Sequence, residues 1–180
     1  MLGLVNFKQR KAIDSVARNL DYLDATVKKF LNLGRIEQNR LKISKTDLDL
    51  NEDIFAPSIE ALVPLAKRKG IEVRDELPRE VALKADADMM KIVANNLLSN
   101  AIKYGQEDGL IKITAEVTPD RVEVDVYNDS VPIGEEQKQK LFKKFSRLEN
   151  EETRTQKGSG LGLYITSQII AKHGGSIRVE

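Results

Sequence analysis

Gly158-Ser159-Gly160-Leu161-Gly162-Leu163 is the stretch that organises this sequence, because three alternating glycines run directly into an apolar helical pattern. Glycine lets the backbone approach a ligand closely, since it has no Cβ and adopts positive φ at little cost. A helix that begins there would direct unpaired N–H groups and the positive end of its dipole at a phosphate chain. The stretch therefore favours a nucleotide site, and the alternative is a flexible turn before a helix.

A second polar pattern lies upstream, on a helix expected over residues 88–104. Asn96, Asn100 and Lys103 fall at positions i, i+4 and i+7, so they share one face of that helix. Amide oxygens are hard ligands that suit Mg²⁺, and a lysine supplies a point charge for phosphates. A solvated helix face would explain the same residues, but the flanking positions are apolar and predict a helix that is otherwise buried. Together the two patterns favour a nucleotide site.

Composition excludes several other classes of protein. The chain has 29 basic and 28 acidic side chains, so it lacks the basic excess that indicates nucleic-acid binding. It has no cysteine, which excludes disulfides and thiolate metal sites and favours a cytoplasmic setting. No apolar run approaches the roughly 20 residues that cross a bilayer. We therefore expect no membrane contact by this segment.

Residues 8–45 are expected to form one long helical arm. Its apolar positions recur at spacings of three and four residues, which is the seam of a coiled coil or helix bundle. They are Ile13, Val16, Leu20, Leu23, Val27 and Phe30. A helix of about 35 residues cannot bury that seam against a compact domain, so we expect a homodimer through helix 8–45. The alternative is that the seam packs against the domain of its own chain.

The rest of the chain alternates between helical and strand patterns. Residues 47–51 are expected to form a linker, and residues 54–70 a helix that Pro57 and Pro64 delay or kink. Asp86 is the expected N-cap of helix 88–104. Two more helices are expected over 135–145 and 160–173, and strands over 71–75, 81–84, 110–117, 121–127 and 176–179. Residues 146–157 are expected to be a mobile loop. The pattern predicts an α+β sandwich with helices on one face of a sheet.

Three segments resemble the motifs of a known family. Asn96-Leu-Leu-Ser-Asn100-Ala-Ile-Lys103-Tyr104 resembles the N box of the GHKL ATPases, in particular of two-component sensor histidine kinases. Phe142-Lys-Lys-Phe145-Ser-Arg147 is similar to their F box, and residues 158–163 are similar to their G2 box. In the arm, Leu33-Gly-Arg35-Ile-Glu37 is similar to the second helix of their dimerisation and phosphotransfer hairpin. The resemblance spans nearly the whole chain.

The resemblance implies a fold and a set of ligands. The fold is a Bergerat-type α/β sandwich with a mixed sheet and three covering helices, over residues 47–180, preceded by a partial hairpin over residues 1–46. The cofactors are ATP and Mg²⁺. The resemblance implies that Asn100, helped by Asn96, holds Mg²⁺ and the triphosphate, and that Lys103 and Tyr104 contact phosphate and sugar.

The same resemblance names further site residues. Arg147 would approach the γ-phosphate or the partner helix. With Asn96, which would help to hold Mg²⁺ and the triphosphate, it is one of the two expected catalytic residues. The remaining expected nucleotide contacts are Asn128, Ile133, Lys157, Gly158, Ser159, Gly160, Leu161, Gly162 and Leu163. Residues 134–160 would form a lid over ATP.

The chain departs from the family at the G1 box, which typically reads Asp-x-Gly-x-Gly and binds adenine through its aspartate. Here the sequence is Asn128-Asp129-Ser130-Val131-Pro132. Valines at 122, 124 and 126 form the apolar face of the strand, so Asn128 continues inward and Asp129 points away. An amide oxygen can still accept a hydrogen bond from adenine, more weakly than a carboxylate. Ser130 and Pro132 replace both glycines, so we expect an altered but functional pocket.

A second departure is the missing phosphoacceptor. These kinases phosphorylate a histidine on the first hairpin helix, and the sequence has none before Lys8. Its one histidine, His173, precedes Gly174 at an expected helix end, where an imidazolium would favour the dipole. The sequence is therefore expected to be a piece of a larger sensor protein that can be anchored in a membrane elsewhere.

These observations favour the ATP-binding catalytic domain of a sensor histidine kinase. In the intact protein it would move the γ-phosphoryl of Mg·ATP to a histidine on a missing helix, and then to an aspartate in the receiver domain of a response regulator. This chain alone is not expected to autophosphorylate. One alternative is another GHKL protein kinase or ATPase. The other is a degenerate module that binds nucleotide or a partner without kinase activity.

Overall fold

The computed structural model describes residues 5–38, 40–147 and 158–180. The chain separates into two compact units, Met1–Leu41 and Lys42–Glu180. Residues 42–46, which the sequence assigns to the arm, group with the second unit. The backbone N–H of Ser44 donates to the Asp86 carboxylate at 2.9 Å, and Nζ of Lys45 donates to the carbonyl oxygen of His173 at 3.1 Å. These bonds hold the start of the second unit.

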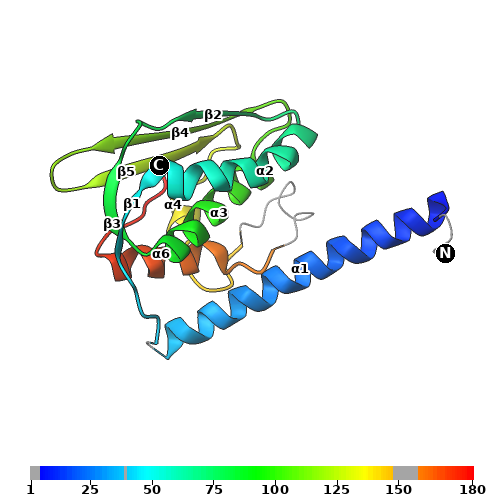
Figure 1. The fold of residues 1–180 in the computed structure, drawn as a ribbon, viewed down its shortest axis with the longest axis horizontal. Coiled ribbons are helices and arrows are strands. Elements are labelled where there is room, and N and C mark those ends of the chain that lie inside the picture. The colour runs from blue at the N-terminus through cyan, green and yellow to red at the C-terminus, as the bar shows by residue number, and fades with distance from the viewer. Residues whose placement is uncertain (1–4, 39, 148–157) are drawn as a thin grey trace. The chain divides into compact units, whose positions relative to one another are not determined.

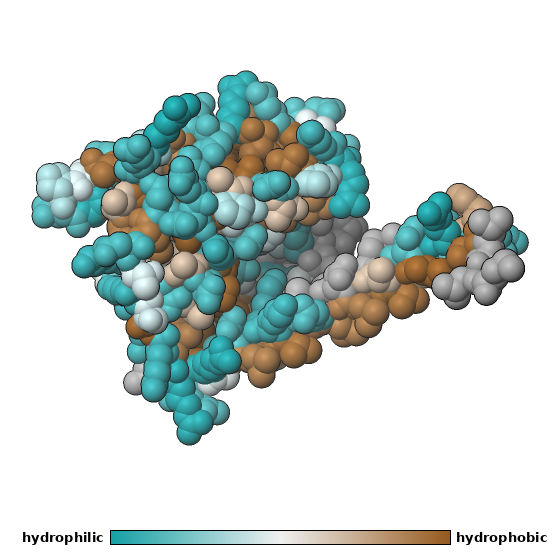
Figure 2. All heavy atoms as spheres, viewed as in Figure 1, coloured by the Kyte–Doolittle hydropathy of each residue, from teal (hydrophilic) through white to brown (hydrophobic). Residues whose placement is uncertain are grey.

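The first unit is built on helix α1 (Phe7–Glu37). A capping box begins it, in which the Asn6 side chain accepts from the N–H of Gln9 and the Gln9 side chain accepts from that of Asn6, both at 2.9 Å. All six residues of the predicted seam are more than half exposed. Figure 2 shows hydrophobic residues in a line along this helix. The seam is therefore an exposed apolar stripe.

The prediction that the helix continues to residue 45 is wrong. The N–H of Gln38 donates to the carbonyls of Gly34 and Ile36 at the end of the helix, and residues 40–45 are not helical. The reason is tertiary, because the chain from Ser44 onward is committed to hydrogen bonds within the second unit.

The second unit contains two sheets. Strand β1 (Thr46–Asp49) pairs antiparallel with β3 (Ala82–Ala85), with Leu48 opposite Leu83. The predicted linker over residues 47–51 is therefore wrong, because these residues find a partner more than 30 positions away. A π-helical turn, η1 (Leu50–Phe55), follows β1 and leads into helix α2 (Ala56–Arg68). Pro57 lies in the first turn of α2, where the missing N–H costs nothing.

The larger sheet is mixed, as predicted. Its strand order is β2 (Glu72–Glu76), β4 (Leu110–Val117), β5 (Val122–Asn128), with β2 parallel to β4 and β4 antiparallel to β5. Helix α2 and helix α3 (Ala87–Tyr104) pack against this sheet, and helix α6 (Gly162–His173) packs against α3. Figure 1 shows this helical layer beneath the strands. The predicted α+β fold class is confirmed.

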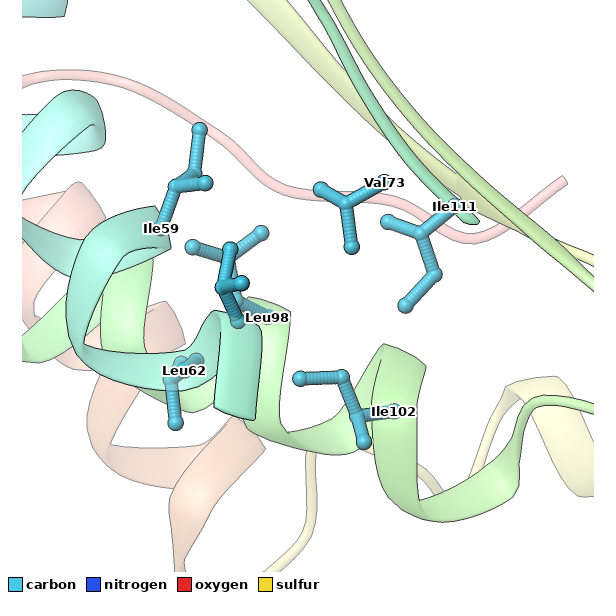
Figure 3. Close-up of a pocket in the computed structure, with 7 residues that line it drawn as sticks. Ile59, Leu62, Val73, Leu98, Ile102 and Ile111 are labelled. Atoms are coloured by element: carbon cyan, nitrogen blue, oxygen red, sulfur yellow. The ribbon is translucent and has the colours of Figure 1, made fainter. Parts of the chain in front are cut away.

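The core lies between the helices and the sheet. Ile111 and Ile113 of β4 are at most 1% exposed, and Ala94, Leu98 and Ile102 of α3 cover them. A cavity of about 10 Å³ remains among side chains of α2, α3, β2 and β4, including Ile59, Val73 and Leu98 (Figure 3). Such a volume has room for about one water molecule, and its lining is hydrocarbon. It is a packing gap and is too small for a nucleotide.

Two predicted elements are corrected in the last part of the chain. The helix predicted over residues 135–145 is the short α4 (Glu135–Lys138), after which the chain continues in turns to Phe145, whose φ is +59°. A bulky residue in the left-handed region cannot belong to a helix. Residues 175–180 form no strand; the Arg178 guanidinium instead pairs with the Glu123 carboxylate of β5. Within the described ranges, no helix is both long and apolar enough to span a membrane.

Candidate nucleotide site

Helix α3 carries the polar face at the centre of the candidate site. Its start is fixed by Asp86, whose carboxylate accepts the N–H of Met89 at 3.1 Å, as the sequence predicts. Asn96 is 7% exposed, and its Nδ2 lies 3.4 Å from both the carbonyl oxygen of Gly162 and Oγ1 of Thr166. Asn96 therefore ties α3 to the first turn of α6, a role that the sequence pattern did not reveal.

Asn100 and Lys103 continue this face toward the end of α3. Asn100 is half-buried, and its amide makes no hydrogen bond to any residue of the described ranges. Nζ of Lys103 donates to the hydroxyl of Tyr104 at 2.9 Å and lies 4.5 Å from the centre of that ring. An amide oxygen and an ammonium are thus presented side by side, which is a combination that suits a metal-bound phosphate.

The glycine-rich stretch packs directly against this face. A Cβ placed on Gly158 would lie 2.8 Å from Nζ of Lys103, and one on Gly162 would lie 3.4 Å from Oδ1 of Asn96. Gly160 has a φ of +68°, and its Cβ would lie 2.6 Å from the backbone carbon of Phe145. Glycine is therefore required at 160, while a side chain at 158 would displace the flexible end of Lys103 and 162 leaves room for a methyl group. The two sequence patterns meet in space.

Helix α6 begins at Gly162, two residues later than predicted, because Gly160 is in the left-handed conformation. Leu161 at the N-cap position is fully buried and offers no side-chain cap. The first N–H groups of this helix consequently have no capping side chain and suit an anion. Ser159 and Leu163 flank this point and are half-buried.

The end of strand β5 has the register predicted from the valine alternation. Asn128 lies opposite Ile111, whose side chain is buried on the helical side of the sheet, so Asn128 shares that face. Asp129 is engaged elsewhere. Its carboxylate accepts the Tyr127 hydroxyl at 2.7 Å and the Leu110 N–H at 2.8 Å. The Tyr127 hydrogen bond, followed by the Leu110 N–H, lowers the pKa of Asp129.

The other predicted site residues are not joined to this cluster by the contacts above. Ile133 is half-buried just before α4, and Arg147 is exposed. Lys157 and the rest of residues 148–157, which belong to the predicted mobile loop over 146–157 and to the predicted lid over 134–160, lie outside the described residues. The predicted roles of these residues remain predictions.

The comparisons with known proteins agree with this geometry. Residues 85–180, which include α3, the sheet strands β4 and β5 and α6, match the family of histidine kinase-, DNA gyrase B- and HSP90-like ATPases. The chain belongs to this ATPase family. Its place within the family is that of a histidine kinase catalytic domain, and it is accordingly an ATP-binding domain.

Relatives and solved structures support that placement. The chain is 30% identical over 159 residues to the sensor protein VanS of Enterococcus faecium, covering 88% of this chain and 41% of the relative. The catalytic domain of the histidine kinase ThkA is 34% identical, with a TM-score of 0.67 over 76% of this chain and 88% of that one. ThkA in complex with the response regulator TrrA is 28% identical, with a TM-score of 0.71 over 99% of this chain and 49% of that one. The chain thus spans less than half the length of VanS.

Proposed function

We propose that this domain binds Mg·ATP across α3 and the 158–162 stretch and, in the intact protein, transfers the γ-phosphoryl group to a histidine. The observation that carries the proposal is that Gly158 lies close to Nζ of Lys103. On the same helix face, the Asn100 amide has no hydrogen-bonding partner among the described residues. Lys103 would neutralise phosphate charge, and the uncapped N-terminus of α6 would bind phosphate oxygens.

The residues present fit a magnesium ion. Mg²⁺ prefers oxygen ligands and usually keeps several waters, so one protein ligand beside a triphosphate suffices. Asn100 would supply that ligand through its amide oxygen, helped by Oδ1 of Asn96, because the bonds of Asn96 to α6 use its Nδ2. When bound, the ion supplies charge neutralisation at the phosphates.

The transfer itself is mainly a matter of positioning. The bond between the γ-phosphorus and the bridging oxygen of ADP breaks, a bond to an imidazole nitrogen forms, and ADP leaves. Arg147 is proposed to approach the γ-phosphate or the acceptor helix. Asn128 is proposed to accept a hydrogen bond from the amino group of adenine, with Ile133 near the base.

We further propose a homodimer through α1 and transfer to the receiver domain of a response regulator. The exposed seam supports the dimer. The response regulator is supported by the similarity to ThkA, which is described in complex with one.

Calorimetric titration with ATP, with and without Mg²⁺, tests the proposal. We expect micromolar-range binding that strengthens with Mg²⁺, and a loss of about tenfold or more in Asn100→Ala, equivalent to about 1.4 kcal/mol. Asn95→Ala is the matched control, because Asn95 is exposed on the same helix and its side chain donates to the carbonyl of Lys91. Absence of nucleotide binding by the native chain would favour a degenerate module.

A further inference from the structure

Lys69 makes a contact that neither the sequence pattern nor the proposed site uses. It follows α2 directly, and its side chain reaches the neighbouring end of α3. Its Nζ donates to the carbonyl oxygens of Ile102, Lys103 and Gly105, at 3.0, 3.1 and 3.1 Å. An ammonium has three N–H donors, so these contacts use all of them.

The contact meets a specific need of α3. The last carbonyls of a helix have no partner within the helix, and they carry the negative end of its dipole. An ammonium beside these carbonyls donates hydrogen bonds to them and also offsets the negative end of the dipole. One of the carbonyls belongs to Lys103, and another to the residue just before it. Lys69 therefore fixes the backbone from which the Lys103 side chain extends.

Lys69 is itself held in place. Its carbonyl accepts the N–H of Asp108 at 3.0 Å, and its own N–H donates to Ala66 at 2.9 Å. Gly70 and Asp108, which contact each other, both have positive φ, at +69° and +56°. The turn after α2 and the loop after α3 are thus joined through backbone, so the Lys69 ammonium has a fixed origin.

We propose that Lys69 is a positioning residue for phosphate binding: it holds the last turn of α3 so that Nζ of Lys103 faces Gly158. This inference rests on the proposed function, because it assigns Lys103 to the phosphates. Lys69 would not touch the nucleotide. Its removal should therefore weaken binding through the phosphates and leave binding through the nucleoside unchanged.

The test compares Lys69→Met with Lys67→Met. Methionine keeps most of the hydrocarbon stem and removes the charge and all three donors. Lys67 is an exposed lysine in the last turn of the same helix, so it controls for lost positive charge. Affinities for ATP and for adenosine are measured by titration, together with thermal unfolding.

We expect Lys69→Met to raise the Kd for ATP about tenfold, because hydrogen bonds to a charged group are lost, and to change that for adenosine less than twofold. Lys67→Met should change neither. The double variant Lys69→Met/Lys103→Met should bind ATP no more weakly than Lys103→Met alone, because both act through one ammonium. If Lys69→Met does not fold, Lys69→Gln, which keeps two donors, should shift the ratio of the two affinities in the same direction.

The outcomes separate this inference from the proposed function. An equal loss for ATP and adenosine would show a structural role only and would overturn the inference. So would unchanged ATP binding in Lys69→Met or Lys69→Gln while Lys103→Met binds weakly, and in that case the proposed function stands. If Lys103→Met binds ATP normally, both the phosphate role of Lys103 and the positioning role of Lys69 are wrong.

Discussion

Nε2 of His173 accepts the backbone N–H of Asp86 at 3.0 Å, which joins the end of α6 to the start of α3. A backbone N–H can only donate, so Nε2 carries no proton and the ring is neutral. Nδ1 lies 2.8 Å from the carbonyl oxygen of Ile169 and therefore donates to it. The expected imidazolium at the helix end is thus corrected. His173 connects the two helices that carry the candidate site.

This connection predicts that His173 is not a phosphoacceptor. Both ring nitrogens are engaged in hydrogen bonds, so neither offers a free lone pair to the γ-phosphorus. Incubation of the chain with γ-labelled ATP should give no acid-labile phosphate. His173→Ala should lower the free energy of unfolding by about 1–3 kcal/mol, because the Asp86 N–H loses its acceptor. Label that appears in the native chain and is absent from His173→Ala would refute this assignment.

The Asp129 carboxylate predicts how stability depends on pH. Its pKa is lowered below the ordinary value of 3.8, first by the Tyr127 hydroxyl and then by the Leu110 N–H. Because the pKa is lowered in the folded state, the ionised carboxylate stabilises the fold fully above pH 3.8. This stabilisation is lost as the pH falls from 3.8 through the folded-state pKa.

Urea unfolding between pH 3 and 6, about where an aspartate titrates, measures this dependence. Asp129→Asn should show a shallower loss of stability below pH 4, roughly, than the native chain. Asp125→Asn is the matched control, because Asp125 is an exposed aspartate of β5, the strand that precedes Asp129, and it should keep the native slope. Tyr127→Phe should raise the pKa of Asp129 in an NMR titration. An unchanged pKa in that variant would contradict the assigned cause.

With Asn128 in place of an aspartate, we expect this domain to discriminate only weakly between ATP and GTP. A carboxylate only accepts hydrogen bonds, whereas an amide also donates and can therefore pair with the carbonyl oxygen of guanine. Asn128→Asp should tighten ATP binding by about three- to tenfold and raise the preference for ATP over GTP, because charge-assisted hydrogen bonds are stronger. Competitive titration of ATP and GTP measures both effects.

The control for this prediction is Asp129→Asn, because Asp129 follows the end of β5 and is bonded to Tyr127 and Leu110. It should leave the ratio of ATP to GTP affinity at the native value, whatever its effect on stability. If Asn128→Asp also leaves that ratio unchanged, Asn128 does not contact the base.

Local patterns identified the elements whose partners are near in sequence. Alternation gave β4 as residues 110–117, as observed, and the helical period gave α3 within one residue of its observed start. The alternation of valines in β5 predicted that Asn128 lies on the inward face, as the register shows. The polar face of α3 and the glycine stretch were identified by residue type, and the structure brings them into contact.

The elements that were missed depend on distant contacts. Strand β1 exists because residues 82–85 lie beside it, and α1 ends early because the following chain bonds to Asp86 and His173. The three-carbonyl contact of Lys69 and the bond between Asn96 and α6 also join segments more than 30 residues apart. No local period or propensity encodes such contacts, so they appear only once the fold is known.

The exposed seam of α1 predicts self-association. Leu23 lies in the middle of the seam and is 56% exposed. At about 25 cal/mol per Å², burying this stripe against a second copy offsets part of the cost of association. A lysine in the seam would place a charge in the apolar contact, so Leu23→Lys should weaken the dimer at least tenfold, about 1.4 kcal/mol.

Sedimentation across a concentration series measures this equilibrium. Ser15→Lys is the control, because Ser15 is a neutral, exposed residue of the same helix outside the seam, so the substitution adds the same single positive charge. It should dimerise as the native chain does. Equal weakening by both substitutions would point to charge repulsion rather than to the seam. A native chain that remains monomeric at high concentration, unchanged by Leu23→Lys, would mean that the seam does not pair with a second copy.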